Sequence, residues 1–235
     1  MLRYVYIAVL LSLLSGCAPL QSVDTLDGLL ARVEHTYGAA TQMKAVRQSG
    51  QLSSARGGSV GHVTRNFVYP DKLRIDIAFP DGRTEQRVLN AGQGWRHGRA
   101  SQGPSLDAMR LQAARIGLPR LLLDQRARVR ELPSDNADKS RRTLELELDD
   151  NLRIIAQIDA ATGRIVASQG VLGNSSTRMI FDASYDDFRS QDGGLYAFKE
   201  SHSVMGRFTG QTTLERVEVL PSLADELFMP STMSQ

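Results

Sequence analysis

Hydrophobic residues recur at helical spacing in two stretches of the chain. The first stretch follows Asp24 and contains Leu26, Leu29, Leu30, Val33, Tyr37, Ala40 and Met43. This spacing predicts an amphipathic helix that begins at an N-cap Asp24 and buries one face. Residues 105–125 have the same pattern, and Pro119 within them predicts a break or a second short helix.

Elsewhere the apolar residues occur at every second position, which predicts strands. The apolar positions of these strands include Leu73, Ile75, Ile77, Phe79, Leu144, Leu146, Ile154 and Ile158. Charged residues such as Arg74 and Glu145 occupy the alternate positions, so one face of the sheet is apolar and the other is in water. Turns such as Pro80-Asp81-Gly82 join successive strands and favour antiparallel pairing.

The order of these elements predicts an α+β fold. One helix is followed by about four or five strands, one or two helices, and about six or seven further strands. The helices are the segments that can cover the apolar face of the sheet. We therefore expect a strongly curved antiparallel sheet that forms an incomplete β-barrel of about 11 strands, covered by helices.

The composition excludes several classes of protein. Of the 235 residues, 41% are hydrophobic and 23% are charged, and the formal net charge is +2. Such a chain can form a core, and its charge is too small to favour a nucleic-acid binder. The single cysteine allows neither a disulfide framework nor a cysteine-based zinc site.

The first 17 residues have the features of a bacterial targeting signal. Arg3 precedes an apolar stretch, residues 4–14, that is too short to span a bilayer. Leu14-Ser15-Gly16-Cys17 resembles a lipobox, in which the cysteine is lipidated and becomes the first residue of the mature protein. We expect a lipoprotein signal peptide at 1–16, a lipidated tether at 17–23 and the folded domain at 24–230. The alternative is an ordinary secretory signal with an incidental cysteine.

The lipobox also implies a location. Proteins with this motif resemble one another in carrying a diacylglyceryl group and an N-acyl chain, which together suffice for stable anchoring. Ala18 stands where lipoproteins retained at the inner membrane typically have Asp. The resemblance implies a protein anchored by lipid at the periplasmic face of the outer membrane of a Gram-negative cell. We expect no cofactor besides the covalent lipid on Cys17.

A series of short motifs, taken in order, resembles the outer-membrane lipoprotein-sorting family, the LolA/LolB-like proteins. The motifs are 69–76 (YPDKLRID), 81–82, 94–95, 163–166 (GRIV), 181–188 (FDASYDDF), Gly193 and 227–230 (LFMP). Members of this family fold as a half-closed antiparallel barrel with a helical lid over an apolar cavity. The cavity holds acyl chains of lipoproteins or other lipids.

The resemblance implies a set of site residues and partners. The acyl-chain cavity is expected at Leu73, Ile75, Ile77, Phe79, Leu144, Leu146, Ile154 and Ile158, for which core packing is the alternative role. The lid helix is expected to carry Leu118, Leu121 and Leu122. The implied partners are lipoprotein acyl chains or other lipids, the inner leaflet of the outer membrane, and a periplasmic carrier or transporter. We expect a monomer that does not bind nucleic acid.

Two features depart from the family pattern. The anchored receptor of the family begins its strands with several tryptophans, whereas this chain has only Trp95. The soluble carrier has a functional arginine that reaches its lid, and its counterpart among Arg65, Arg74 and Arg87 is open. Phe79 lies at a hairpin comparable to the loop where the receptor exposes an apolar side chain.

The sequence contains no pattern that indicates catalysis or metal binding. His35, His62, His97 and His202 are scattered, and we interpret them as surface residues. Asp182, Asp186, Asp187 and Asp192 lack the spacing of a calcium loop, and no GxSxG motif is present. We therefore expect neither an enzyme nor a metal protein.

Residues 110–142 carry a net charge of +5, from eight arginines and Lys139 against four acidic residues. A solvated surface is one interpretation of this basic tract, and contact with lipid phosphates is the other.

The leading hypothesis is a lipid-anchored periplasmic protein that holds acyl chains and assists lipoprotein or lipid transfer to the outer membrane. The alternative is a sensor or scaffold on the same fold that reports on lipoproteins to a partner protein. A lipid hydrolase is a third reading, with the least support because no nucleophile and base stand out as a pair.

Overall fold

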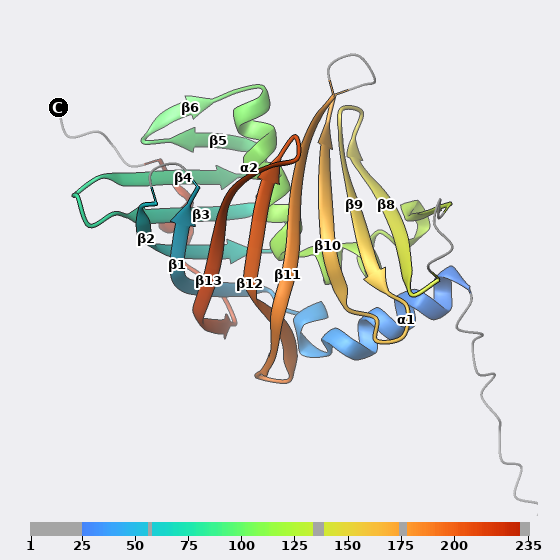
Figure 1. Cartoon of the computed structure of the whole chain (residues 1–235). Coiled ribbons are helices and arrows are strands. Elements are labelled where there is room, and N and C mark those ends of the chain that lie inside the picture. The colour runs from blue at the N-terminus through green and yellow to red at the C-terminus, as the bar shows by residue number, and fades with distance from the viewer. Residues whose placement is uncertain (1–24, 56–57, 134–138, 174–177, 231–235) are drawn as a thin grey trace, which may run out of the picture.

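The computed structural model describes residues 25–55, 58–133, 139–173 and 178–230. These residues form one antiparallel sheet of 13 strands and three α-helices (Figure 1). The predicted signal peptide 1–16, the tether 17–23 with Cys17, and Asp24 lie outside the described residues.

The helices are α1 (Leu26–Tyr37), α2 (Pro104–Ile116) and α3 (Leu118–Asp124), with 3-10 helices η1 (Ala39–Thr41), η2 (Arg126–Arg128) and η3 (Asp225–Phe228). The strands before α2 are β1 (Ala45–Ser54), β2 (Val60–Val68), β3 (Lys72–Ala78), β4 (Thr84–Asn90), β5 (Gln93–Arg96) and β6 (Arg99–Ser101). The strands after α3 are β7 (Arg130–Leu132), β8 (Arg141–Asp149), β9 (Leu152–Asp159), β10 (Ile165–Leu172), β11 (Met179–Gln191), β12 (Gly194–Val204) and β13 (Arg207–Leu220).

The sheet is a curved and open half-barrel. Its strand order is β6-β5-β4-β3-β2-β1-β13-β12-β11-β10-β9-β8-β7. The first strand of the chain, β1, therefore pairs with the last strand, β13, at the centre of the sheet. In Figure 1 the strand direction turns strongly between β3 and β10, and α2 lies inside the bend while α1 runs along one end. The predicted fold class is confirmed, with 13 strands where about 11 were expected.

Helix α1 begins at a different cap and ends earlier than the sequence pattern indicates. The N-cap is Thr25, whose hydroxyl accepts a hydrogen bond from the Gly28 amide at 3.0 Å. The helix ends at Gly38, which has a φ of 49° and lies against Gly193, where a Cβ would come within 2.5 Å of the carbonyl oxygen. The expected helical stretch to Met43 is therefore wrong beyond Tyr37, because only glycine can adopt this close, left-handed conformation.

The break that was expected near Pro119 occurs two residues earlier, at Gly117. Pro119 lies in the first turn of α3, where its missing amide proton costs no helical hydrogen bond. A Cβ on Gly117 would contact the rings of Phe67 and Tyr69 at 3.2 Å, so the junction between α2 and α3 lies directly on β2 and its following loop.

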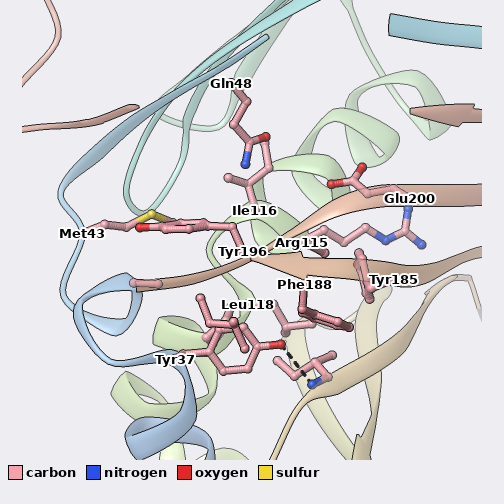
Figure 2. A pocket seen from close by; sticks show the side chains of 15 residues that line it. Tyr37, Met43, Gln48, Arg115, Ile116, Leu118, Tyr185, Phe188, Tyr196 and Glu200 are labelled. Atoms are coloured by element: carbon pink, nitrogen blue, oxygen red, sulfur yellow. Dashed lines mark hydrogen bonds between the residues drawn. The ribbon is translucent and has the colours of Figure 1, made fainter. Parts of the chain in front are cut away.

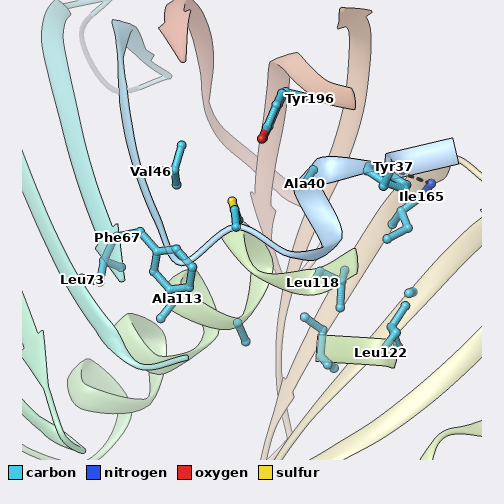
Figure 3. Packing of buried hydrophobic residues seen from close by; sticks show 14 of the residues in the cluster. Tyr37, Ala40, Val46, Phe67, Leu73, Ala113, Leu118, Leu122, Ile165 and Tyr196 are labelled. Carbon is cyan, nitrogen blue, oxygen red and sulfur yellow. Dashed lines mark hydrogen bonds between the residues drawn. The ribbon is translucent and has the colours of Figure 1, made fainter. Parts of the chain in front are cut away.

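One continuous hydrophobic core fills most of the space between the helices and the concave face of the sheet (Figure 3). Leu73 and Phe67 from the first half of the sheet pack near Ala113 of α2, while Leu118 and Leu122 of α3 pack near Ile165. Fully burying a side chain of this size contributes roughly 1.5–3 kcal/mol, so the helices are held to the sheet chiefly by this core. Within the described residues, every helix is too short or too polar to cross a bilayer.

Candidate functional site

A pocket lies where the three helices meet the concave face of β10, β11 and β12 (Figure 2). We call it the lid pocket, and it is lined by Tyr37, Ala40, Met43, Gln48, Arg115, Ile116, Leu118, Pro119, Ile165, Tyr185, Phe188, Leu195, Tyr196, Ala197 and Glu200. Most of these side chains are apolar. The Tyr37 hydroxyl accepts a hydrogen bond from the Ile165 amide at 3.0 Å, which joins α1 to β10 at the pocket wall.

The lid pocket contains about 70 Å³ of free space. A single water needs roughly 10–15 Å³ on this measure, so the pocket holds only a handful of water-sized groups. The space is therefore a small hollow beside a packed core. A long acyl chain could enter it completely only if α2 and α3 moved outward.

Two buried polar atoms of the lid pocket have no hydrogen-bond partner among the described residues. They are Gln48 Oε1 and the hydroxyl of Tyr196, and both side chains are 7% exposed. Burial raises the pKa of Tyr196 to about 12, so its hydroxyl keeps a proton that it can donate. An unsatisfied buried polar atom costs about 1–3 kcal/mol, and a guest with polar atoms or an ordered water would recover this energy.

A second, more polar hollow adjoins the lid pocket and contains about 40 Å³. We call it the polar pocket, and it is lined by Arg65, Ile75, Gln112, Arg115, Ile116, Ala183, Tyr185, Glu200 and His202. Arg115, Ile116, Tyr185 and Glu200 belong to both linings, so the two hollows meet at these four side chains.

An ion pair crosses the concave face beside this junction. Arg65 of β2 extends over β1 and β13 to Glu200 of β12, with Nη1 and Oε2 2.8 Å apart. Arg65 also donates to the Thr212 hydroxyl at 2.9 Å, and His202 Nε2 lies 3.2 Å from the same hydroxyl. Both charged side chains are nearly buried, so each depends on the other for its charge to be tolerated.

The charges of this cluster set the protonation of its members. Burial acts to raise the pKa of Glu200, but the charge of Arg65, His202 when it is protonated at acidic pH, the Arg65 hydrogen bond and the charge of Arg115 outweigh it, so the pKa lies below its ordinary value. Burial lowers the pKa of His202 to about 4, with Arg65 and Arg115 acting in the same direction and Glu200 against them. At neutral pH, Glu200 is therefore charged and His202 is neutral.

The residues that the sequence predicted for an acyl-chain cavity lie mainly in the core. Leu73, Ile77, Leu144, Leu146, Ile154 and Ile158 are buried in the hydrophobic cluster, and Phe79 packs at its edge with Arg83 stacked 4.9 Å from its ring centre. Ile75 lines the polar pocket. Among the predicted lid residues, Leu118 lines the lid pocket, Leu122 is buried and Leu121 is partly buried. Their role in holding an acyl chain stays a prediction.

Several side chains of the two pockets were not identified from the sequence, although some carried a signal. Arg65 stands between Val63 and Phe67 at an inward-facing position of β2, where an apolar residue is the rule. Arg115 falls one helical turn after Leu111 on the apolar side of α2. A charged residue within an apolar stripe was thus the detectable sign of a polar site. Tyr196 and Gln48 gave no such sign.

His202 differs from the surface histidines that the sequence indicated, because it lines the polar pocket. His35, His62 and His97 are exposed as expected. In the part of the chain that the structure describes, no group of histidine, aspartate or glutamate side chains could hold a metal ion.

The basic tract 110–142 is distributed over α2, α3, η2, β7 and β8. Five of its arginines form ion pairs with carboxylates. One is Arg110, whose guanidinium lies 2.6 Å from Asp149, and another is Arg142, which binds Glu131 at 2.5 Å. Much of the charge is therefore balanced locally, and contact of this tract with lipid phosphates stays a prediction.

A half-open antiparallel barrel with helices over its concave face and a small apolar pocket beneath them defines the class of this fold. The structure is similar to a LolA superfamily protein from Nitrosomonas europaea, with 11% sequence identity and a TM-score of 0.57 over 87% of this chain and 97% of that one. The fold of this chain is therefore LolA-like, as the sequence motifs implied.

Two more distant structures have lower scores. A domain described as outer membrane lipoprotein-sorting from Vibrio parahaemolyticus has 8% identity and a TM-score of 0.48, covering 86% of this chain and 94% of that one. A DUF1329 family protein from Desulfovibrio piger has 12% identity and a TM-score of 0.49 at the same coverage of both chains. No family model matches the sequence, and no curated protein does.

Proposed function

We propose that this chain is a lipid-anchored periplasmic protein that binds acyl chains and assists the transfer of lipoproteins or other lipids to the outer membrane. The observation that supports it best is the apolar lid pocket between the helices and the concave sheet of a LolA-like fold. The proposal assigns no catalytic step to the chain, since binding and release alone account for such a role.

The energetics of an acyl chain suit such a role. Transfer of a tail of about 16 carbons from water contributes on the order of 10 kcal/mol, before the costs of binding. The lid pocket is too small for the whole tail, so part of this energy is used to displace the lid. The lipid then passes to whichever protein or membrane binds it more tightly. Release is easy because the cost of opening the lid lowers the net affinity of this chain for the lipid.

Photolabelling tests acyl binding with the full-length protein in its membrane. A photoreactive, uncharged hexadecanol analogue is added, and labelled peptides are mapped by mass spectrometry. We expect labels at the lid pocket, on peptides that contain Leu118 and Tyr196.

Ile116→Trp fills the junction of the pockets and should reduce labelling at least about tenfold. The matched control is Leu121→Trp, on the same lid but outside the pocket lining, which should retain the labelling. Equal labelling of Ile116→Trp and wild type would contradict acyl binding at this site.

The lipid anchor is tested at Cys17. In a Gram-negative host, the wild-type protein should fractionate with the outer membrane and carry an N-terminal mass increase equal to three acyl chains with glycerol. Cys17→Ala should lack this modification and leave the outer-membrane fraction, because the acyl chains that are expected to hold the protein there are missing. An unmodified wild-type Cys17 would favour the ordinary secretory signal.

A further inference from the structure

One arginine of the lid stands at the junction of the two pockets with its charge unpaired. Arg115 of α2 donates from Nε to the Ser168 hydroxyl at 3.2 Å and from Nη2 to the Phe181 carbonyl oxygen at 2.6 Å. Both partners are neutral. None of the ion pairs between described residues includes Arg115, although it lines the lid pocket, as Figure 2 shows, and also the polar pocket.

The polar pocket consequently has one positive charge in excess. Arg65 is neutralised by Glu200, 2.8 Å away, and His202 is neutral at pH 7, so the charge of Arg115 remains. Arg65 and Arg115 both act on the charge of Glu200, so two guanidinium groups share one carboxylate. An anion placed beside Arg115 therefore gains charge-assisted hydrogen bonds. The Tyr185 hydroxyl, 2.7 Å from Ser168 Oγ in a hydrogen bond that either oxygen can donate, is a further polar group at the same junction.

The position of this charge next to an apolar hollow determines the shape of a complementary guest. We propose that the two pockets together bind a single-tailed amphiphile with an anionic head, a carboxylate or a phosphate. The head lies in the polar pocket against Arg115, and the acyl chain enters the lid pocket, which widens as α2 and α3 move outward. This inference rests on the proposed function and narrows it, because acyl binding alone requires no charge on the lipid.

Competition against the uncharged photoprobe measures the head-group preference in the full-length protein. The competitors are palmitate and palmitoyl lysophosphatidate, which are anionic, and hexadecanol and monopalmitoylglycerol, which are neutral. We expect at least one anionic competitor to displace the probe from wild type at about tenfold lower concentration than its neutral counterpart, the effect of one charge-assisted contact. The better of the two anions identifies the head as carboxylate or phosphate.

Variants of Arg115 separate recognition of the head from support of the lid. Arg115→Gln should abolish the preference, so that anionic and neutral competitors displace the probe at equal concentrations, and Arg115→Lys should restore part of the preference. The matched control is Arg110→Gln on the same helix, whose guanidinium binds Asp107 and Asp149 outside both pockets, and it should keep the wild-type preference.

Three results would overturn the inference in distinguishable ways. Equal displacement by anionic and neutral lipids in wild type would leave acyl binding intact and remove the head-group site. A loss in Arg115→Gln that is equal for all four competitors would make Arg115 a support of the lid only. No displacement by any of the four lipids in wild type would remove the proposed function itself.

Discussion

The inward-facing polar residues of the sheet link its stability to pH. His202 is neutral in the folded protein, with a pKa of about 4, whereas an unfolded chain has a histidine pKa near 6.5. At pH values between these two pKa values, the histidine of the unfolded chain is protonated, whereas His202 of the folded chain stays neutral. Acidification through this window therefore favours unfolding, by a total on the order of 3 kcal/mol from this group.

Urea unfolding at several pH values tests this coupling. His202→Asn can still hydrogen-bond Thr212, and we expect it to flatten the decrease in unfolding free energy between about pH 6.5 and 4. His35→Asn changes an exposed histidine and should leave the decrease as in wild type. A slope in His202→Asn equal to that of wild type would mean that other groups produce it.

Helix α2 packs closely on strand β10 at Gly170. A Cβ on Gly170 of β10 would lie 2.5 Å from the side chain of Leu111 in α2. The helix can approach the strand this closely only because the position is glycine. A larger residue forces the Leu111 side chain to repack or pushes α2 away from the sheet, and the second is the direction of movement that acyl entry requires.

Gly170→Val should therefore destabilise the protein by about 1–3 kcal/mol and loosen the lid. We expect faster amide hydrogen exchange throughout α2, measured by mass spectrometry, with the outer strands of the sheet unchanged. Ala167→Val, on the opposite face of the same strand, is the matched control and should leave α2 protected. Unchanged exchange in α2 for Gly170→Val would show that the close approach does not hold the lid.

The pairing of β1 with β13 makes one continuous sheet from the two halves of the chain. These strands lie about 160 residues apart in sequence, and they join the sheet of the first half to the sheet of the second. At the register shift between Ser49 and Gly50, a Cβ on Gly50 would lie 2.2 Å from the Thr213 carbonyl oxygen. We call the β1–β13 pairing the central seam of the half-barrel, and it leaves no room for a side chain at position 50.

Gly50→Ala should lower the unfolding free energy by more than about 2 kcal/mol. Because the core is continuous across the seam, fluorescence of Trp95 in β5 and far-UV circular dichroism should report one common urea transition at a lower midpoint. Gln51→Ala, with an exposed side chain on the same strand, should shift the midpoint little. If Trp95 kept its wild-type midpoint while the ellipticity did not, the two halves would fold independently.

Much of the fold followed from local patterns. The alternation around Leu73 and Leu144 indicated which face of each strand is buried, and the helical spacing located α1, α2 and α3. The end of α1 could not be predicted from local patterns, because Gly38 ends the helix through its contact with Gly193, a residue far away in the sequence. Local periodicity contains no information about such distant contacts.

The sequence by itself determined the period of each element, the motifs of a LolA-like fold and the expectation of a lipidated Cys17, because these depend on neighbouring residues. Only the tertiary structure decided which side chains surround a hollow. The β1–β13 pairing brings Arg65, Arg115 and Glu200 together from three distant segments, while most of the apolar stripe closes into a solid core. Whether two apolar surfaces meet flush or leave a space depends on the volumes of all the side chains between them, and this sum is defined only when the chain is folded.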